Sequence, residues 1–264
     1  MSAEASMGQA PTPADRLAHA AAVVFDTDGV ITDSARLHAA AWKEAFDACL
    51  RAHPPADPQA RRPFGQDDYL RYVDGRTRMD GAASFLAARK VALPLGTLDD
   101  PPGTDTVGAV AAHKERLFTE RLRTRGVDAY PGTLRLLRRL RERGVPMAAA
   151  SASRHAGELL DRSGTLPYFT AVVDGTEATR LGLPGKPAPD LFLEAARRIH
   201  APPGRTAVIE DSLAGVEAGR RGGFGLVVGV DRTPGTTYRD ALLERGADLA
   251  VTDLSELLTD STEG

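Results

Sequence analysis

The sequence predicts an α/β protein with a doubly wound parallel sheet and an inserted all-helical cap domain. Two observations lead to this fold class. Short unbroken apolar runs, each bounded by polar or glycine residues, alternate with segments of helical periodicity, as buried parallel strands alternate with crossover helices. A long segment after the first run shows helical patterns alone, so it interrupts the alternation and indicates a separate helical unit.

The first predicted strand is the apolar run at residues 21–25, which ends in Asp26-Thr27-Asp28-Gly29. Later apolar runs of the same kind predict strands at residues 145–150, 171–173, 206–209 and 224–230. The intervening periodicity predicts helices at residues 133–143, 153–163, 189–199 and 213–221. Ligands of such sheets bind beyond the carboxyl ends of the strands, so the polar residues that follow these runs are candidates for chemistry.

The segment that shows only helical patterns predicts how the chain is divided into domains. Helical patterns occupy residues 35–51, 67–73, 79–90 and 107–125, with Pro/Gly-rich stretches between them. We therefore predict a cap domain at 33–129 and a core domain formed by 19–32 and 130–264. Residues 1–18 are rich in Ala, Ser, Pro and Gln and lack the basic start and apolar middle of a signal peptide, so we predict a disordered tail there.

Composition excludes several classes of function. Apolar residues make up 42% and charged residues 26% of the 264-residue chain, and the net charge is −3, so we expect no nucleic-acid partner. We expect no membrane partner, because no apolar run is long enough to cross a bilayer. The single cysteine, Cys49, lies in a helical pattern and indicates core packing in a reducing, cytoplasmic setting. We expect a monomer, because a hinged cap needs no partner.

Asp26 and Asp28 stand two residues apart at the first strand end, where Gly29 allows the chain to turn. Near Mg²⁺, one carboxylate can attack phosphorus and form an aspartyl phosphate. The other can exchange a proton with the leaving or incoming oxygen. An ordinary Asp-rich turn is the competing interpretation.

Other strand ends add complementary groups. Ser151 could donate hydrogen bonds to phosphoryl oxygens, although it and Ser153 are also typical of helix caps. Lys186 offers a positive charge in a proline-stiffened loop, unless it is a surface lysine. Glu210 and Asp211 could complete an oxygen site for Mg²⁺, unless Asp211 caps the next helix. Together these residues supply what phosphoryl transfer requires.

The order of these residues resembles the four motifs of the haloacid dehalogenase superfamily, whose core is Rossmann-like. The resemblance covers nearly the whole chain after the tail. It implies that Asp26 is the phosphorylated nucleophile and Asp28 the general acid/base, and that Ser151 and Lys186 bind the phosphoryl group. It also implies a Mg²⁺ site formed by Asp26, the backbone carbonyl of Asp28, Glu210 and Asp211.

Three further features resemble the β-phosphoglucomutase family. They are Asp28-Gly29-Val30-Ile31-Thr32-Asp33-Ser34 followed by His38 and Trp42, then Gly75-Arg76-Thr77-Arg78, and then Ser151-Ala152-Ser153 followed by Arg154-His155. The resemblance implies that His38 positions the acid/base, that Arg78 grips the distal phosphate and that the loop at Ala152 and Ser153 touches the substrate. Lys114 is a further candidate for electrostatics in the cap. His38 on an ordinary helix face and Arg78 as a solvated arginine are the competing interpretations.

The sequence departs from this family in three places. Asp74 stands where a lysine is usual before the cap-loop glycine, and Thr27 replaces a leucine or methionine. The stretch at 177–185 is longer than is typical.

The resemblance implies a small-molecule sugar phosphate as substrate and Mg²⁺ as cofactor. We expect interconversion of β-D-glucose 1-phosphate and glucose 6-phosphate through an aspartyl phosphate and glucose 1,6-bisphosphate. A sugar-phosphate phosphatase would use the same residues but would let water reach the phosphorylated Asp26. A non-catalytic sugar-phosphate sensor is a second alternative, which the presence of every core catalytic residue type disfavours.

Overall fold

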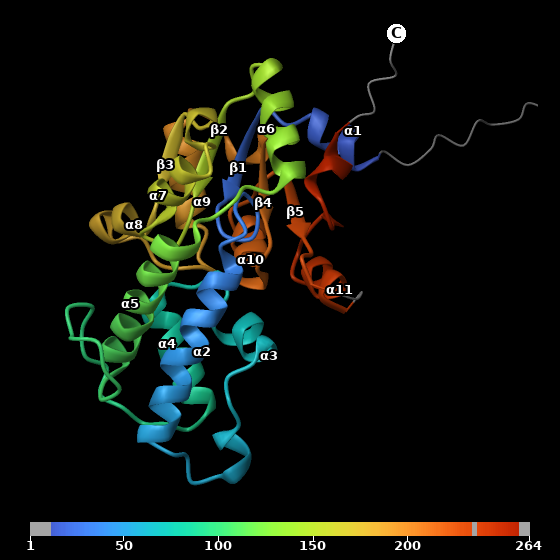
Figure 1. The fold of residues 1–264 in the computed structure, drawn as a ribbon. Coiled ribbons are helices and arrows are strands. Elements are labelled where there is room, and N and C mark those ends of the chain that lie inside the picture. The colour runs from blue at the N-terminus through green and yellow to red at the C-terminus, as the bar shows by residue number, and fades with distance from the viewer. Residues whose placement is uncertain (1–11, 234–236, 259–264) are drawn as a thin grey trace, which may run out of the picture.

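The computed structural model describes residues 12–233 and 237–258. Within these ranges, six parallel strands form one sheet in the order β3-β2-β1-β4-β5-β6. The strands are β1 (Ala22–Asp26), β2 (Met147–Ala150), β3 (Ala171–Val173), β4 (Thr206–Glu210), β5 (Leu226–Val230) and β6 (Leu249–Val251). The chain starts in the middle of the sheet and winds outward in both directions, which confirms the predicted doubly wound fold (Figure 1).

Helices cover both faces of the sheet. They are α1 (Pro13–Ala18), α6 (Pro131–Glu142), α7 (Ala156–Arg162), α8 (Gly175–Leu181), α9 (Asp190–Arg198), α10 (Leu213–Arg221) and α11 (Thr237–Glu244). One apolar cluster joins α1, α6 and α7 to one face, and a second joins α9, α10 and α11 to the other. Strand residues are therefore buried on both sides, which explains why the predicted runs are continuously apolar rather than alternating.

A group of helices follows β1 and stands beyond one end of the sheet (Figure 1). We call residues 35–125 the helical insert; its helices are α2 (Ala35–Ala52), α3 (Gln66–Asp68), a π-helical turn η2 (Tyr69–Val73), α4 (Arg78–Ala88) and α5 (Val107–Arg125). It has its own apolar cluster, in which Phe46 lies 4.1 Å from Phe85 between ring centroids. Cys49 is buried in that cluster, as predicted.

Two adjacent segments connect the helical insert to the sheet. Thr32 forms a β-bridge with Ala129, and the Asp33 amide donates to the Asp128 carbonyl at 3.0 Å. The chain thus enters and leaves the insert at one place, close to the carboxyl end of β1. The domain boundaries at 33 and 129 stay a prediction.

The predicted disordered tail is wrong for its last residues, because Pro13–Ala18 form α1. Thr12 and Asp15 make a capping box, Pro13 suits the first helical turn, and Leu17 is buried against the sheet. Residues 1–11 lie outside the described ranges. Within the described ranges, no helix combines the length and apolar character needed to cross a bilayer.

Candidate active site

Lys186 links the carboxyl ends of the two central strands. Asp26 ends β1 and Glu210 ends β4, and the Lys186 ammonium donates to Asp26 Oδ1 at 2.6 Å and to Glu210 Oε2 at 3.0 Å. The side chain of Lys186 is buried, so it is not a surface lysine. Burial opposes its charge, but Asp26 and Glu210 outweigh burial and raise the pKa of Lys186. The ammonium therefore stays charged and neutralises part of a dense acidic cluster.

The loop after β1 packs directly against Asp211. Gly29 has a φ of +80°, and a Cβ built on it would lie 1.7 Å from Asp211 Oδ2. Both the left-handed backbone and the close approach therefore require glycine. The turn carries Asp28 away from the direction of β1, so Asp26 and Asp28 have different surroundings, as the sequence predicted.

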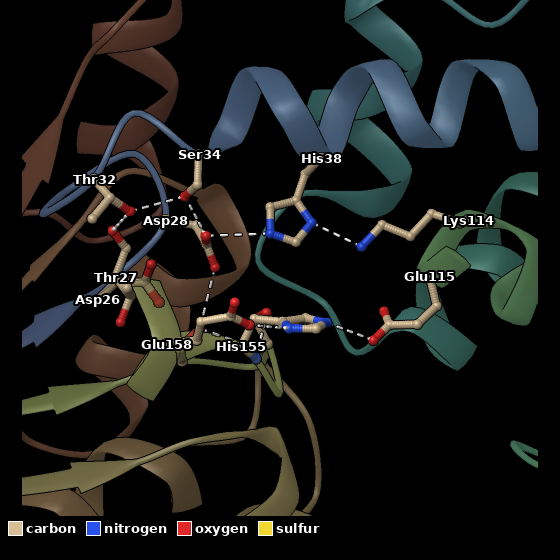
Figure 2. A network of polar contacts seen from close by, with 12 residues as sticks. Asp26, Thr27, Asp28, Thr32, Ser34, His38, Lys114, Glu115, His155 and Glu158 are labelled. Atoms are coloured by element: carbon tan, nitrogen blue, oxygen red, sulfur yellow. Dashed lines mark hydrogen bonds and ion pairs between the residues drawn. The ribbon is translucent and has the colours of Figure 1, made fainter. Parts of the chain in front are cut away.

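Asp28 receives hydrogen bonds from two hydroxyl groups. Ser34 Oγ donates to Asp28 Oδ1, and Ser151 Oγ donates to Asp28 Oδ2 at 3.2 Å. His38 Nε2 from α2 also lies 3.2 Å from Asp28 Oδ1 (Figure 2). Burial opposes ionisation of Asp28, but the interactions with His38 and Ser34 outweigh it and hold the pKa of Asp28 far below its usual range. The carboxylate is ionised and can accept a proton.

Lys114 of α5 sets the protonation of His38. Its ammonium lies 2.8 Å from His38 Nδ1, and an ammonium can only donate, so Nδ1 accepts and the ring proton sits on Nε2, facing Asp28. Burial and the charge of Lys114 lower the pKa of His38, in agreement with a neutral ring. Burial also lowers the pKa of Lys114 to about 8. The helical insert therefore orients the Asp28 carboxylate through two of its side chains, Lys114 and His38.

Three carboxylates form the candidate metal centre. One oxygen from each of Asp26, Glu210 and Asp211 lies within 4.8 Å of the others. Burial and the charge of Glu210 raise the pKa of Asp26, while burial and the charge of Asp74 raise the pKa of Asp211. Lys186 relieves the mutual repulsion of these carboxylates only in part, and hard oxygen ligands of this kind fit Mg²⁺. The Asp28 side chain is not part of this group, and the role of its backbone carbonyl stays a prediction.

The variant Asp211→Asn should separate the destabilising repulsion within this cluster from its contribution to Mg²⁺ binding. Without metal the variant should be as stable as the parent or more stable, because one repelled carboxylate is gone. In the parent, Mg²⁺ at about 100 times its Kd should stabilise the fold by about 2.7 kcal/mol, and the variant should lose most of that gain. Thermal unfolding with EDTA and with Mg²⁺ measures both effects. An equal Mg²⁺ response in both proteins would place the metal elsewhere.

Except for Ser151, the predicted phosphate- and substrate-binding residues line one cavity of about 220 Å³. Its walls include Asp26, Asp28, His38, Trp42, Arg78, Lys114, Ala152, Ser153, Lys186 and Asp211. The helical insert and the strand ends both contribute, so the cavity lies between them. The structure thus brings these residues together, while their individual roles stay predictions.

Three competing interpretations are wrong. The N-cap of α10 is Ser212, whose Oγ accepts from the Gly215 amide at 3.0 Å, so Asp211 is not the cap. The residue at the N-cap of α7 is His155, so Ser153 is not that cap. The Arg78 side chain is only 15% exposed and faces the cavity rather than solvent.

Sequence reasoning missed two acidic groups that line the cavity. From the sequence, Asp74 was noted only as a departure from a family pattern. In the structure it lines the cavity, and burial and the charge of Glu210 raise its pKa to about 7. Glu115 was missed altogether, because an acidic residue beside Lys114 on a charged helix resembles any solvated face. Residues 177–181 of the stretch at 177–185 belong to α8.

Comparison with known proteins shows the family of this chain. The family model for haloacid dehalogenase-like hydrolases matches residues 20–223. Beta-phosphoglucomutase of Mycobacterium bovis is 40% identical over 238 residues, covering 90% of this chain and 91% of the relative. Beta-phosphoglucomutase of Bacillus subtilis is 30% identical over 243 residues, covering 89% and 94%.

A solved structure of β-phosphoglucomutase from Clostridium difficile has the same fold, with a TM-score of 0.66 and 22% identity over 90% of this chain and 93% of that one. The chain belongs to the haloacid dehalogenase superfamily and, within it, to the β-phosphoglucomutase-like family.

Proposed function

We propose that this protein is a Mg²⁺-dependent β-phosphoglucomutase that interconverts β-D-glucose 1-phosphate and glucose 6-phosphate. The observation that carries the proposal is the position of Asp28. It is an ionised carboxylate beside the Asp26 strand end, and it is oriented by His38 of the helical insert. The two relatives named as beta-phosphoglucomutases support the same reaction.

In the first half-reaction, the 6-hydroxyl of β-glucose 1-phosphate attacks the phosphorus of phosphorylated Asp26. The P–O bond to Asp26 breaks, a bond to the sugar oxygen forms, and Asp28 takes the hydroxyl proton. Lys186 and Ser151 lie beside the two carboxylates, where they can donate to phosphoryl oxygens. The products are glucose 1,6-bisphosphate and free Asp26.

In the second half-reaction, the bisphosphate has turned round and Asp26 attacks the phosphorus of the C1 phosphate. Asp28 returns its proton to the departing sugar oxygen, which yields glucose 6-phosphate and regenerates phosphorylated Asp26. Arg78, which lines the same cavity, holds the phosphate that is not reacting.

Asp26, Glu210 and Asp211 are the residues that would hold Mg²⁺, which supplies positive charge to the phosphoryl group and screens it from the carboxylate that attacks it. Trp42 and Phe118 pack on Lys114, with ring centroids 5.5 and 4.7 Å from its ammonium. The helical insert thus buries Lys114, whose ammonium contacts His38 beside the acid/base.

A coupled assay tests the proposal. The protein with Mg²⁺, β-glucose 1-phosphate and a trace of glucose 1,6-bisphosphate should form glucose 6-phosphate, and omission of the bisphosphate should leave a long lag. α-Glucose 1-phosphate serves as the matched control substrate and should turn over far more slowly. Release of inorganic phosphate without glucose 6-phosphate would instead establish a phosphatase.

A further inference from the structure

Glu115 contacts three basic side chains, two of which, Arg78 and Arg154, line the cavity. Its carboxylate lies 2.7 Å from His155 Nε2, 2.9 Å from Arg154 Nη2 and 3.6 Å from Arg78 Nη1. Figure 2 shows the contact with His155. Glu115 and Arg78 come from the helical insert, whereas Arg154 and His155 follow β2. One carboxylate therefore joins the two parts of the protein.

The contacts of Glu115 with Arg78 and His155 differ from the exposed ion pairs on the surface, whereas Arg154 is 47% exposed. The side chains of Glu115 and Arg78 are 16% and 15% exposed, while Glu120 on the same helix is 68% exposed and lies 3.9 Å from Arg116. Burial opposes ionisation of Glu115, but the hydrogen bond with His155 and the charge of Lys114 outweigh it and hold the pKa of Glu115 far below its usual range. The carboxylate is thus a fixed negative charge.

The groups around Glu115 are those that a phosphate monoester would use. Two guanidinium groups and an imidazole supply charge-assisted donors, which suit a dianionic phosphate at least as well as a carboxylate. Arg78, Glu115, Ser153 and Arg154 line the same cavity as Asp26. An arriving phosphate and the Glu115 carboxylate cannot both take these donors, and like charges repel at this range.

We propose that Glu115 is a specificity-determining residue, whose carboxylate holds the cationic donors until the non-reacting phosphate of the substrate displaces it. The inference rests on the proposed function and deepens it. A ligand with a phosphate replaces the carboxylate with another anion that the same donors can bind, and this keeps the helical insert joined to the sheet. A neutral sugar cannot, so the site rejects it. Because its phosphate must displace the Glu115 carboxylate, every phosphorylated ligand binds more weakly than it would without that carboxylate.

Calorimetric titration of glucose 6-phosphate in Mg²⁺, with no phosphoryl donor, tests this competition. Glu115→Gln keeps the shape of the side chain and removes its charge. The variant should bind glucose 6-phosphate about tenfold more tightly than the parent, or about 1.4 kcal/mol. Glu120→Gln, the matched control on the same helix, should bind as the parent does. Glucose without phosphate should bind detectably neither to the parent nor to Glu120→Gln.

A purely structural Glu115 would give the opposite result. If the carboxylate only holds Arg78 and Arg154 in place, Glu115→Gln binds glucose 6-phosphate as weakly as the parent or more weakly, and the inference is overturned. Should the Gln variant fold poorly, as judged by thermal unfolding, Glu115→Asp withdraws the carboxylate by one methylene and should also bind more tightly than the parent.

The titration does not depend on turnover. A parent that binds glucose 6-phosphate but forms none from β-glucose 1-phosphate would contradict the proposed function alone. Unchanged affinity in the Gln variant of an active mutase would contradict the role of Glu115 alone. If neither parent nor variant binds glucose 6-phosphate, the role of Glu115 is contradicted as well.

Discussion

Asp26→Asn should abolish turnover, with a fall in kcat of about 10⁴-fold or more, as expected when a covalent nucleophile is removed. The carboxamide cannot form the acyl phosphate. Glu210 already accepts from Lys186 and Ser212, and Asp28 faces Ser34 and Ser151, so we assign the attack to Asp26 at the end of β1.

Steady-state kinetics on β-glucose 1-phosphate measures this effect. The variant should fold normally, because burial and the charge of Glu210 already raise the pKa of Asp26, so losing its charge removes repulsion along with the Lys186 contact. Asp161→Asn, at an exposed position on α7, is the control and should leave kcat unchanged. An Asp26→Asn enzyme that keeps a substantial part of the parent's activity would show that another group receives the phosphoryl group.

Lys186→Met should lower the free energy of unfolding by about 3–5 kcal/mol at pH 8 without metal, the range for breaking a buried ion pair. The methionine matches the aliphatic stem, so packing beside Phe192 is largely kept. What is lost is the ammonium that donates to Asp26 and Glu210, which leaves several buried carboxylates without a cation.

The pH dependence of that loss has a definite sign. Asp26 and Asp211 have raised pKa values in the folded protein, because burial and neighbouring carboxylates disfavour their charged forms. The folded state therefore holds protons that the unfolded chain releases, so stability falls as the pH rises above the unfolded value and towards the folded one. Denaturant titrations should show a smaller loss for Lys186→Met at pH 5 than at pH 8.

Mg²⁺ should restore part of the stability of Lys186→Met, because it supplies positive charge to the same carboxylates. Lys43→Met is the control, since Lys43 is half-exposed and pairs with Asp47 at the surface of the helical insert. It should cost about 1 kcal/mol or less. Equal losses for the two lysine variants would contradict the view that Lys186 neutralises a buried acidic cluster.

The strand ends could be predicted because a strand buried on both faces of the sheet is a continuous apolar run, which ends at the first polar residue. That signal alone predicts Asp26, Ser151 and Glu210 at this edge of the sheet. In the structure Lys186 donates to Asp26 and Glu210, and Ser151 donates to Asp28. The helices α5 and α10 were also predicted with their observed ends. Thr106 and Gly126 flank the first, and Ser212 caps the second, so local capping chemistry marks both.

Elements held mainly by tertiary contacts could not be predicted. Helix α8 has seven residues, and its Gly175 lies so close to the Ala152 carbonyl that a Cβ would come within 2.5 Å of that oxygen. The short strand β6 has three residues and was not predicted. Both depend on packing against distant segments, which periodicity within one segment does not report.

The same limit applies to Glu115. Its neighbours Arg154 and His155 are 39 and 40 residues away in sequence, and no local pattern indicates that the helical insert would bring them together. Similarly, the contact between Lys114 and His38 spans 76 residues. Electrostatic roles of this kind become visible only when the charges are placed in space.

The central claim is that Asp26 bonds to phosphorus at a metal-assisted strand end. A crystal structure grown with Mg²⁺ and beryllium fluoride tests it most directly, because the fluoride complex mimics an acyl phosphate. The account predicts beryllium bonded to a carboxylate oxygen of Asp26, with Mg²⁺ held by Asp26, Glu210 and Asp211 and with Lys186 donating to a fluorine. Beryllium on any other side chain, or a metal outside those three carboxylates, would contradict it.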